Sequence, residues 1–187
     1  LIAEETFTDH AGRVRTLQTM KIPFIEPGLN ETAVLSVAID VTEQKQAKEE
    51  VARMRLYLKN IIDSMPSMLI GVDPWGYITV LNQPAEQAGG LSWEAAQGRF
   101  FGDVFPLLEG QFEQVRQAIR HGRPIKTPRM TLESAGEMHY ADVMVYPLMA
   151  DNASGAVIRM DDVTARVRIE SMMVQTEKML SVGGLAA

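Results

Sequence analysis

The 187-residue chain predicts an α+β fold, a five-stranded antiparallel sheet with helices on one face, flanked by helices of the coiled-coil type. Two observations support this prediction. Between about residues 67 and 162, two strand-like segments are followed by short helical segments and then by three longer strand-like segments. In addition, the tripeptide Asp-Val-Thr ends a strand-like segment and opens a charged helix twice, at residues 40–42 and 162–164.

The two Asp-Val-Thr tripeptides belong to a longer internal repeat. Ala11-Gly12 recurs as Ala135-Gly136, 124 residues later, whereas Asp-Val-Thr recurs after 122 residues. A period of this length indicates two tandem copies of one domain, because solenoid repeats are much shorter. Since counting back from Ile125 reaches Leu1, we expect the first copy to be incomplete and the chain to be a piece of a larger protein.

The first copy, residues 1–42, is predicted to form three strands. Residues 9–12 suit a hairpin turn, residues 14–24 an extended strand and residues 26–30 a loop. The β-branched run at residues 33–39 predicts a well-buried strand. Because three strands alone would expose an apolar face, we expect this segment to lean on a neighbouring domain or chain.

Two predicted helices, residues 43–65 and 164–187, flank the complete copy. The apolar seam of the first helix consists of Ala47, Val51, Met54, Leu58, Ile61 and Met65, at alternating steps of four and three. This spacing favours a parallel coiled-coil dimer, although a helix packed on its own domain would show a similar stripe. The seam of the second helix is weaker because it includes Thr176 and Gly183; its residues are Ala165, Ile169, Met172, Thr176, Met179, Gly183 and Ala186.

The complete copy is predicted to span residues 66–163. Its predicted strands are residues 68–72, 77–81, 125–133, 138–149 and 156–161, and its predicted helices are residues 83–87, 93–97 and 109–121. Residues 73–76 suit the turn between the first two strands. Ser92 is an expected helix N-cap, and Gly122 is expected to end the longest helix.

Composition narrows the function classes. The chain is 46% hydrophobic and 22% charged, as in ordinary globular proteins, and has no apolar run long enough to span a bilayer. Its formal net charge is −6 with acids and bases interleaved, which disfavours nucleic-acid binding. The absence of cysteine excludes disulfides, thiolate nucleophiles and Cys-ligated metals.

Several short motifs occur in one order across the complete copy. They are Asp73-Pro74-Trp75-Gly76-Tyr77-Ile78, Leu81-Asn82-Gln83-Pro84-Ala85, the stretch 90–98, His121-Gly122-Arg123-Pro124 and Asp162-Val163-Thr164. In this order and at this spacing the region resembles the PAS family of sensory modules. The resemblance covers about residues 55–165 and implies a PAS-like sheet with helices on one face.

The stretch 177–187 resembles the opening of the dimerisation helix of sensor histidine kinases. In that family the phosphoacceptor histidine follows a few residues later, so we expect the chain to stop just before it. The resemblance implies that the chain is the sensory and signal-relay region of a cytoplasmic two-component kinase. Whether the whole protein has a membrane anchor upstream stays open. The expected partners are a second copy through helices 43–65 and 164–187, a downstream ATP-dependent histidine kinase domain and a response regulator.

The chain itself carries no constellation of catalytic residues, so the piece is expected to be inert. PAS modules sense through a molecule held between sheet and helices. The expected lining is Ile70, Val72, Leu81, Asn82, Gln97, Phe101, Phe105, Phe112, Ile119, Met130, Tyr140, Val143, Val145 and Ile158. A filled core without ligand is the slightly favoured alternative.

The cofactor prediction is no cofactor or an unknown small molecule. Flavin photochemistry through a cysteinyl adduct is excluded because the chain has no cysteine. His121 is the one candidate haem ligand, but its place beside the helix-ending Gly122 favours a role at the negative end of the helix dipole. His10 and His139 have no partner at metal-ligand spacing, so no metal site is expected.

The residues expected to couple sheet to helix are Asp162 and Thr164, with Asp40 and Thr42 in the first copy. Thr164 is predicted to cap the helix through its hydroxyl, and Asp162 to place negative charge at the helix start, within reach of Arg166 and Arg168. Two other functions stay open. One is a ligand-free dimerisation spacer; the other is a sensor for a different output, a cyclic-dinucleotide cyclase or a transcriptional activator.

Overall fold

The computed structural model describes residues 2–25, 32–134, 137–150 and 153–183. The chain divides into two compact units, Leu1–Leu58 and Lys59–Ala187, and each is described separately. The predictions made for loop 26–30, for Ala135-Gly136 and for the last four residues lie outside the described residues.

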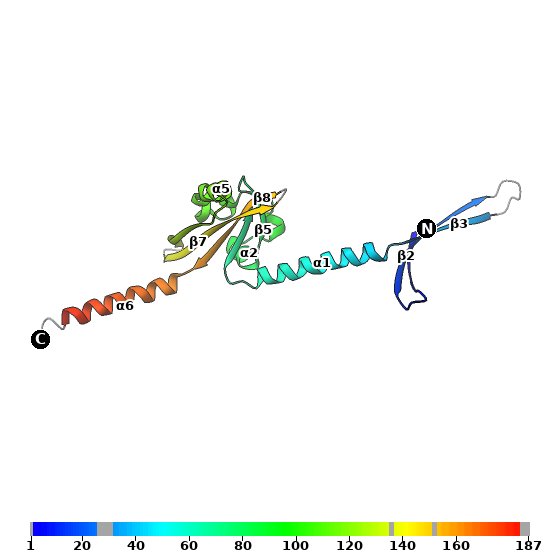
Figure 1. The fold of residues 1–187 in the computed structure, drawn as a ribbon. Coiled ribbons are helices and arrows are strands. Elements are labelled where there is room, and N and C mark those ends of the chain that lie inside the picture. The colour runs from blue at the N-terminus through cyan, green and yellow to red at the C-terminus, as the bar shows by residue number, and fades with distance from the viewer. Residues whose placement is uncertain (1, 26–31, 135–136, 151–152, 184–187) are drawn as a thin grey trace. The chain divides into compact units, whose positions relative to one another are not determined.

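The first unit is a three-stranded antiparallel sheet followed by a helix, as the sequence predicted (Figure 1). Strands β1 (Ile2–Thr8), β2 (Val14–Ile25) and β3 (Thr32–Asp40) lie in that order, and helix α1 runs over Thr42–Asp63. The turn between β1 and β2 is held by Asp9, whose carboxylate accepts the backbone N–H groups of Ala11 and Arg13 at 2.9 Å.

Strand β3 is not buried, and this prediction was wrong. The side chains of Val34, Leu35, Val37 and Ile39 are all exposed, Val34 by 60%. The described part of this unit contains its three strands and part of α1, without a helix layer like the one on the second sheet. The β-branched run therefore forms the predicted strand, but no layer in the described part of this unit covers the strand and buries its side chains.

The second unit is built on a five-stranded antiparallel sheet. Strands β4 (Met68–Val72), β5 (Ile78–Leu81), β6 (Ile125–Ser134), β7 (Glu137–Ala150) and β8 (Ala153–Asp162) lie in the order β5-β4-β8-β7-β6. The last strand in the chain, β8, thus occupies the centre, between β4 and β7. Met68 lies opposite Met160, so the beginning of β4 is beside the end of β8.

Four α-helices and a 3₁₀ helix connect β5 to β6 and follow one another closely. They are α2 (Gln83–Gly89), α3 (Trp93–Ala96), α4 (Phe101–Val104), the 3₁₀ segment η1 (Pro106–Gln111) and α5 (Phe112–His121). The sequence predicted one helix over 109–121, but the α-helix begins only at Phe112. Gly122 ends α5 as predicted, with a positive φ of 60°. Ser92 is the N-cap of α3, but its side chain makes no capping hydrogen bond.

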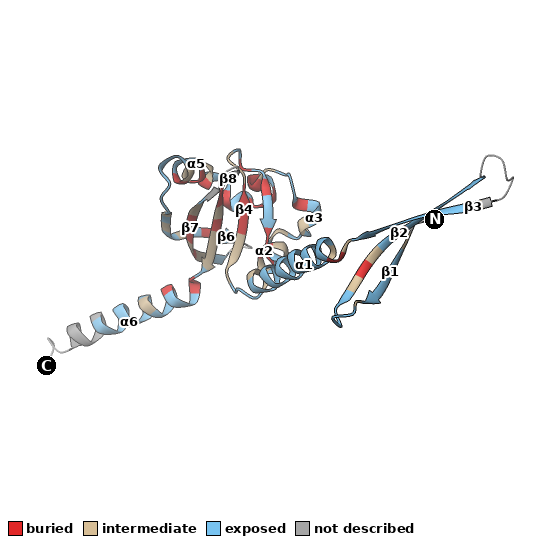
Figure 2. Ribbon diagram, turned by 45° about the vertical axis from the view of Figure 1, so that its right-hand side comes forward, coloured by how far each residue is buried: buried red, intermediate tan, exposed pale blue. Residues whose placement is uncertain are grey.

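The core lies between the sheet and these helices, where buried residues are concentrated (Figure 2). Alternate residues of each strand point inward, as in Val143 and Val145 of β7 and Ala156 and Ile158 of β8. Helix α5 packs on β7 and β8 through its apolar face. The fold prediction, an α+β domain with helices on one face of an antiparallel sheet, is confirmed.

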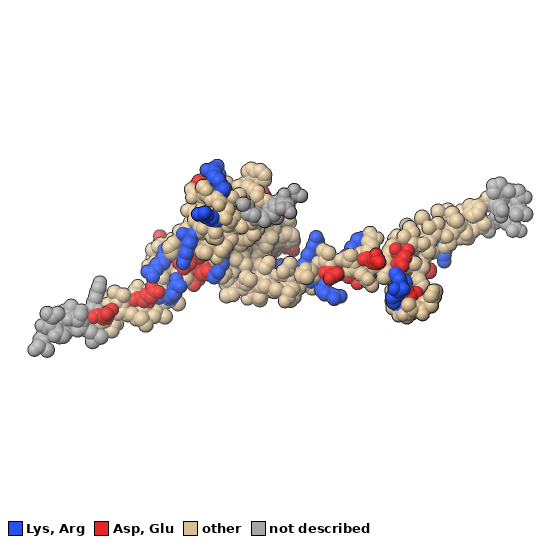
Figure 3. Space-filling view, viewed as in Figure 1, with Lys and Arg blue, Asp and Glu red and all other residues tan. Residues whose placement is uncertain are grey.

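Helix α6 (Thr164–Gly183) follows β8 directly. Acidic and basic side chains alternate along α1 and α6 on the visible face (Figure 3). None of the helices in the described ranges is both long enough and apolar enough to cross a lipid bilayer.

The turn between β4 and β5 requires glycine at residue 76. Gly76 has a φ of +88°, and a Cβ there would lie 2.6 Å from the Phe100 ring. We predict that Gly76→Ala lowers the free energy of unfolding by about 2 kcal/mol or more, from the left-handed backbone and the overpacking together. Urea denaturation followed by circular dichroism measures the change.

Gly110→Ala is the matched control for this substitution. A Cβ at Gly110 would meet nothing within 4 Å, and the residue lies in η1 without a positive φ. The free energy of unfolding of Gly110→Ala should stay within about 0.5 kcal/mol of that of the unsubstituted chain. Equal losses in the two variants would contradict the role assigned to the turn.

Candidate signal-coupling junction and domain interior

The junction between β8 and α6 is held by hydrogen bonds that involve two strands. The Asp162 carboxylate accepts the backbone N–H of Thr164 at 2.8 Å. The Thr164 hydroxyl oxygen accepts the backbone N–H of Tyr140 in β7 at 2.9 Å, and the Tyr140 carbonyl accepts the N–H of Val163 at 2.8 Å. The first residue of α6 is therefore attached to its own strand and to the neighbouring one.

The roles of the two junction side chains differ from the prediction. The sequence assigned helix capping to the Thr164 hydroxyl, but that oxygen is engaged by the β7 backbone, and Asp162 accepts the helix N–H instead. Val163 and Val167 are buried on either side of Thr164. The first turn of α6 is consequently docked on the sheet, while the rest of its described side chains are largely exposed.

Asp162 is held in its charged form. The hydrogen bond from the Thr164 side chain lowers the pKa of the Asp162 carboxyl below its ordinary value, followed by the bond from the Thr164 N–H and by the charges of His139 and Arg168. Because this pKa is lowered on folding, the bond stabilises the junction at neutral pH and is lost only in acid. Arg166 was expected to pair with Asp162, but it lies 3.2 Å from the carboxylate of Asp142.

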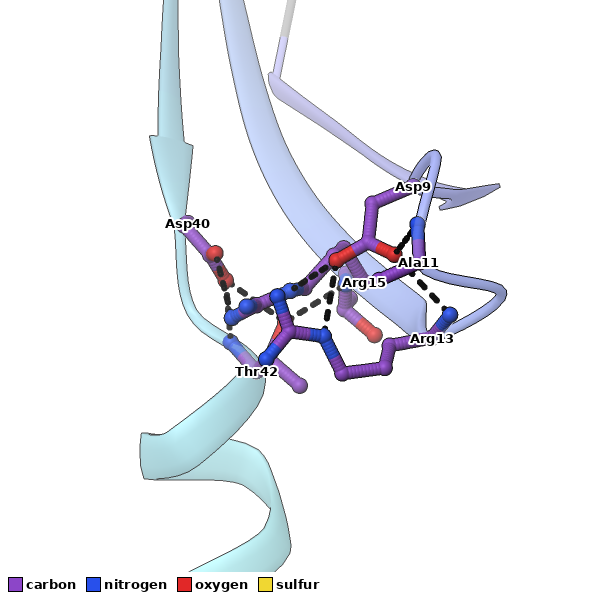
Figure 4. A network of polar contacts seen from close by, with 7 residues as sticks. Asp9, Ala11, Arg13, Arg15, Asp40 and Thr42 are labelled. Carbon is purple, nitrogen blue, oxygen red and sulfur yellow. Dashed lines mark hydrogen bonds and ion pairs between the residues drawn. The ribbon is translucent and has the colours of Figure 1, made fainter.

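The same junction occurs in the first unit (Figure 4). Asp40 accepts the N–H of Thr42 at 2.9 Å, the Thr42 hydroxyl oxygen accepts the N–H of Thr16 at 2.8 Å, and the Thr16 carbonyl accepts the N–H of Val41 at 2.9 Å. The Thr42 side chain is the main cause that lowers the pKa of Asp40. Arg15 adds an ion pair to Asp40 at 3.3 Å.

The two junctions share the same backbone donors and the same acceptor for each of them, although the Thr42 hydroxyl donates to Asp40 and the Thr164 hydroxyl to the Tyr140 carbonyl. Tyr140 follows Thr16 by 124 residues and Asp162 follows Asp40 by 122, the two offsets of the sequence repeat. The strand register agrees, since Leu17 lies opposite Asp40 and Ala141 opposite Asp162. The repeat therefore preserves one particular way of starting a helix from a strand pair.

A second contact between sheet and α6 was missed by sequence reasoning. Asp142 of β7 accepts the N–H of Arg129 at 2.9 Å, and the Arg129 guanidinium reaches Glu170 of α6 at 2.7 Å. Arg129 has a φ of 51°, the one positive φ of a non-glycine residue in the described ranges. The hydrogen bond from the Arg129 N–H is the main cause that lowers the pKa of the Asp142 carboxyl, and the hydrogen bond from the Arg166 side chain lowers it further. Only the preceding Pro128 hinted at this irregularity, because proline cannot donate to a strand ladder; it lies in the edge strand β6, where the pairing with β7 shifts between Thr127 and Met130.

The residues predicted to line a ligand pocket occupy the core of the second unit. The buried ones are Ile70, Val72, Leu81, Asn82, Phe101, Phe105, Val143, Val145 and Ile158, while Phe112, Ile119 and Met130 are partly buried against them. The rings of Phe101 and Phe112 lie 6.4 Å apart, and the rings of Phe100 and Phe112 5.4 Å apart. The structure brings these side chains together, and the occupancy of this interior by a ligand stays a prediction.

The three polar residues predicted to orient a ligand are placed differently from one another. Asn82 is completely buried, but all its hydrogen-bonding capacity is used by backbone groups. Gln97 ends α3 and is exposed, so it does not line the interior. Tyr140 is partly buried and contributes its backbone to the junction.

Gln111 is a buried polar residue that sequence reasoning missed. Its amide oxygen accepts the Thr127 hydroxyl at 3.3 Å, and its amide nitrogen contacts the sulfur of Met130 at 3.4 Å. The helical spacing of apolar residues could have revealed that Gln111 is buried. Gln111 lies three residues after Leu108 and four before Val115, and all three are buried.

The candidate cofactor ligand His121 lies exposed in the last turn of α5, beside Gly122. This position suits the favourable interaction of a cation with the helix C-terminus. Within the described ranges, no three His, Asp or Glu side chains are grouped as a metal site requires.

These features define a small α+β sensory module, in which helices cover one face of an antiparallel sheet and a further helix leaves the end of its central strand. Residues 62–168 match the family described as PAS fold, which is more than half of the chain. The chain belongs to the PAS family.

Three solved structures are similar to part of the chain. The PAS domain of nitrogen regulation protein NR(II) from Vibrio parahaemolyticus is 17% identical, with 56% of this chain and 95% of that chain covered and a TM-score of 0.44. The PAS domain of the histidine kinase ThkA is 24% identical over 52% of this chain and 100% of that chain, with a TM-score of 0.44. VqmA of Vibrio cholerae is 18% identical, with 59% of this chain and 52% of that chain covered and a TM-score of 0.51. A search of curated proteins found no match.

The junction predicts a measurable loss when its hydroxyl is removed. Thr164→Val keeps the shape of the side chain but leaves the Tyr140 N–H without its acceptor, which should cost about 1–3 kcal/mol of unfolding free energy. Thr176→Val is the matched control, because Thr176 is exposed and its hydroxyl bonds the Met172 carbonyl within α6. Urea denaturation of both variants tests this, and a loss no larger than that of the control would contradict the assignment.

Proposed function

We propose that this chain is the sensory and signal-relay PAS region of a dimeric, cytoplasmic two-component sensor histidine kinase. In this proposal α6 leads into the dimerisation helix that carries the phosphoacceptor histidine, and a response regulator receives the phosphoryl group. Residues 1–42 are the end of a first PAS domain, and residues 43–65 are the linker helix between the two copies. The stretch 177–187, with its likeness to the opening of a kinase dimerisation helix, supports this choice of output.

The observation that carries the proposal is the junction between β8 and α6. The start of the helix is attached to the two strands whose inner residues, such as Val143 and Ile158, line the domain interior. A change in the interior that moves β8 against β7 would therefore alter the direction of α6. A ligand acts in this way only by its different affinity for the two arrangements.

The proposed dimer rests on the exposed apolar seams of the two flanking helices. Met54 and Leu58 of α1 and Ile169 and Met172 of α6 are all at least half exposed. Burying such residues against a second copy would stabilise the pair of helices. The weak part of the α6 seam supports two helix registers of similar energy, which a switch requires.

A ligand-free spacer is the second candidate, and one observation favours it. The polar atoms of Asn82 are all satisfied by the protein itself, so this buried residue offers no free group to a ligand. In that case the domain would align the helices of the kinase without sensing.

The output is tested in the full-length parent protein. Asp162→Ala removes the acceptor of the first helix N–H, so we expect basal histidine autophosphorylation to change several-fold, measured by transfer of label from the γ-phosphate of ATP. Asp103→Ala, at the exposed residue of the otherwise buried α4, is the control and should leave autophosphorylation within twofold. Unchanged phosphorylation in Asp162→Ala would exclude the coupling role and favour the spacer. A parent without labelled histidine would exclude the kinase output.

The dimer is tested with two neighbouring methionines. Met172 and Met173 are exposed by 63% and 67%, but only Met172 lies on the predicted seam. We expect Met172→Glu to weaken dimerisation of the chain at least tenfold, because it places two carboxylates face to face, whereas Met173→Glu should change it much less. Sedimentation equilibrium gives the dissociation constants. If the unsubstituted chain is monomeric at high concentration, the proposed dimer is contradicted.

A further inference from the structure

Asn82 is a completely buried amide that joins three elements of the second unit. Its carbonyl oxygen accepts the N–H of Leu69 in β4 at 2.9 Å and the N–H of Ala85 in α2 at 3.2 Å. Its amide nitrogen donates to the carbonyl of Ser67 at 2.8 Å and to the carbonyl of Ile62 at 3.2 Å. One side chain thus connects the end of α1 with the beginnings of β4 and α2.

The bond to Ile62 reaches the last turn of α1. The last four carbonyl groups of a helix have no partner within the helix, and Asn82 supplies one for Ile62. A second bond supports it, since the Asp63 carboxylate accepts the N–H of Gln83 at 3.1 Å. Because Asn82 has two donors and two acceptor sites and all are used, unwinding this turn of α1 would leave a buried N–H unpaired.

Ser67 continues this connection to the neighbouring strand β8. Its backbone carbonyl accepts from Asn82, and its hydroxyl donates to the carboxylate of Asp161 in β8. Arg159 closes the group, with its guanidinium 2.8 Å from the Asp161 carboxylate and 3.3 Å from the Ser67 hydroxyl oxygen. The antiparallel pairing of β4 and β8 brings these residues together, because Met68 lies opposite Met160.

Asp161 precedes Asp162, the residue that accepts the first N–H of α6. A continuous hydrogen-bonded path therefore runs from Ile62 through Asn82 and Ser67 to the end of β8. It connects the last turn of the incoming helix with the first turn of the outgoing one and does not pass through the apolar core. Since its central amide is buried and fully satisfied, a disturbance at one end changes the bonds along the path together.

We propose that this path, named here the Asn82–Ser67–Asp161 clamp, transmits the state of α1 to α6, so that the domain relays a signal arriving from the upstream helix. The clamp deepens the proposed function, because it takes α6 as the output helix. It gives the domain an input other than a ligand in its interior.

The test perturbs α1 and measures α6 in the complete 187-residue chain. Lys59 and Asn60 are exposed near the end of α1, and replacing both with glycine loosens its last turn. We expect amide hydrogen exchange over residues 163–167 to become at least threefold faster, measured by mass spectrometry. Exchange over residues 141–145 of β7 should stay unchanged, which shows that the domain remains folded.

The clamp is then interrupted at Ser67. In a Ser67→Ala background the same double-glycine change should alter exchange over residues 163–167 by less than 1.5-fold. Ser64→Ala is the matched control background, because the Ser64 hydroxyl, just after α1, bonds only back to the Ile61 carbonyl of that helix, and there the threefold effect should persist. Asp161→Ala, which removes the other end of the same bond, should act like Ser67→Ala and serves if Ser67→Ala does not fold.

Two results would overturn the clamp: no acceleration in the parent background, or full acceleration in both interrupted backgrounds. Neither result bears on the autophosphorylation test of Asp162→Ala, which changes only the junction of β8 with α6. The clamp and the proposed output can therefore fail separately.

Discussion

The hydrogen bond from the Tyr140 N–H to the Thr164 hydroxyl is the contact on which the rest of the second unit's output end depends. Without it, the contacts of α6 with the sheet beyond the chain of β8 would be mainly exposed ion pairs, such as Arg129 with Glu170 and Arg166 with Asp142. With it, and with Val163 and Val167 buried beside it, the helix begins at a place defined by two strands of the sheet. The Tyr140 N–H lies just beyond the last residue pair of β7 with β8, Ala141 with Asp162, and a side chain of the helix satisfies it. A movement of α6 away from β7 would therefore leave this N–H without its acceptor.

The same contact in the first unit shows that it is a property of the repeat. Thr42 binds the backbone of Thr16 as Thr164 binds that of Tyr140. The sheets around the two junctions differ, however. Register places Leu17 and Lys21 of β2 at the positions of the core residues Ala141 and Val145, whereas the exposed Met20 and Ile22 lie on the opposite face. The junction is thus independent of how apolar the inner face of its sheet is.

Much of the second unit could be predicted from its sequence. The alternating strands, the turn at Gly76 and the helix end at Gly122 depend on neighbouring residues, so their signals are local. The failures have nonlocal causes. Strand β3 has the composition of a buried strand, yet burial requires a partner that composition cannot supply. The helix predicted from residue 109 begins with 3₁₀ geometry, because the chain turns there between α4 and α5.

Local sequence was therefore sufficient for the strands, most of the helices, the repeat and the position of the junction, since each follows from spacing along the chain, but it did not predict α4 or the 3₁₀ segment before α5. The partners of the functional side chains were decided by tertiary structure alone. Thr164 suits a helix cap in sequence, but the approach of β7 makes its hydroxyl an acceptor for Tyr140. Asn82 suits a ligand contact, but its four bonds are used by the end of α1, the Ser67 carbonyl, β4 and α2. Hydrogen bonds are formed with whatever donor or acceptor folding brings within reach, and that group is usually distant in sequence.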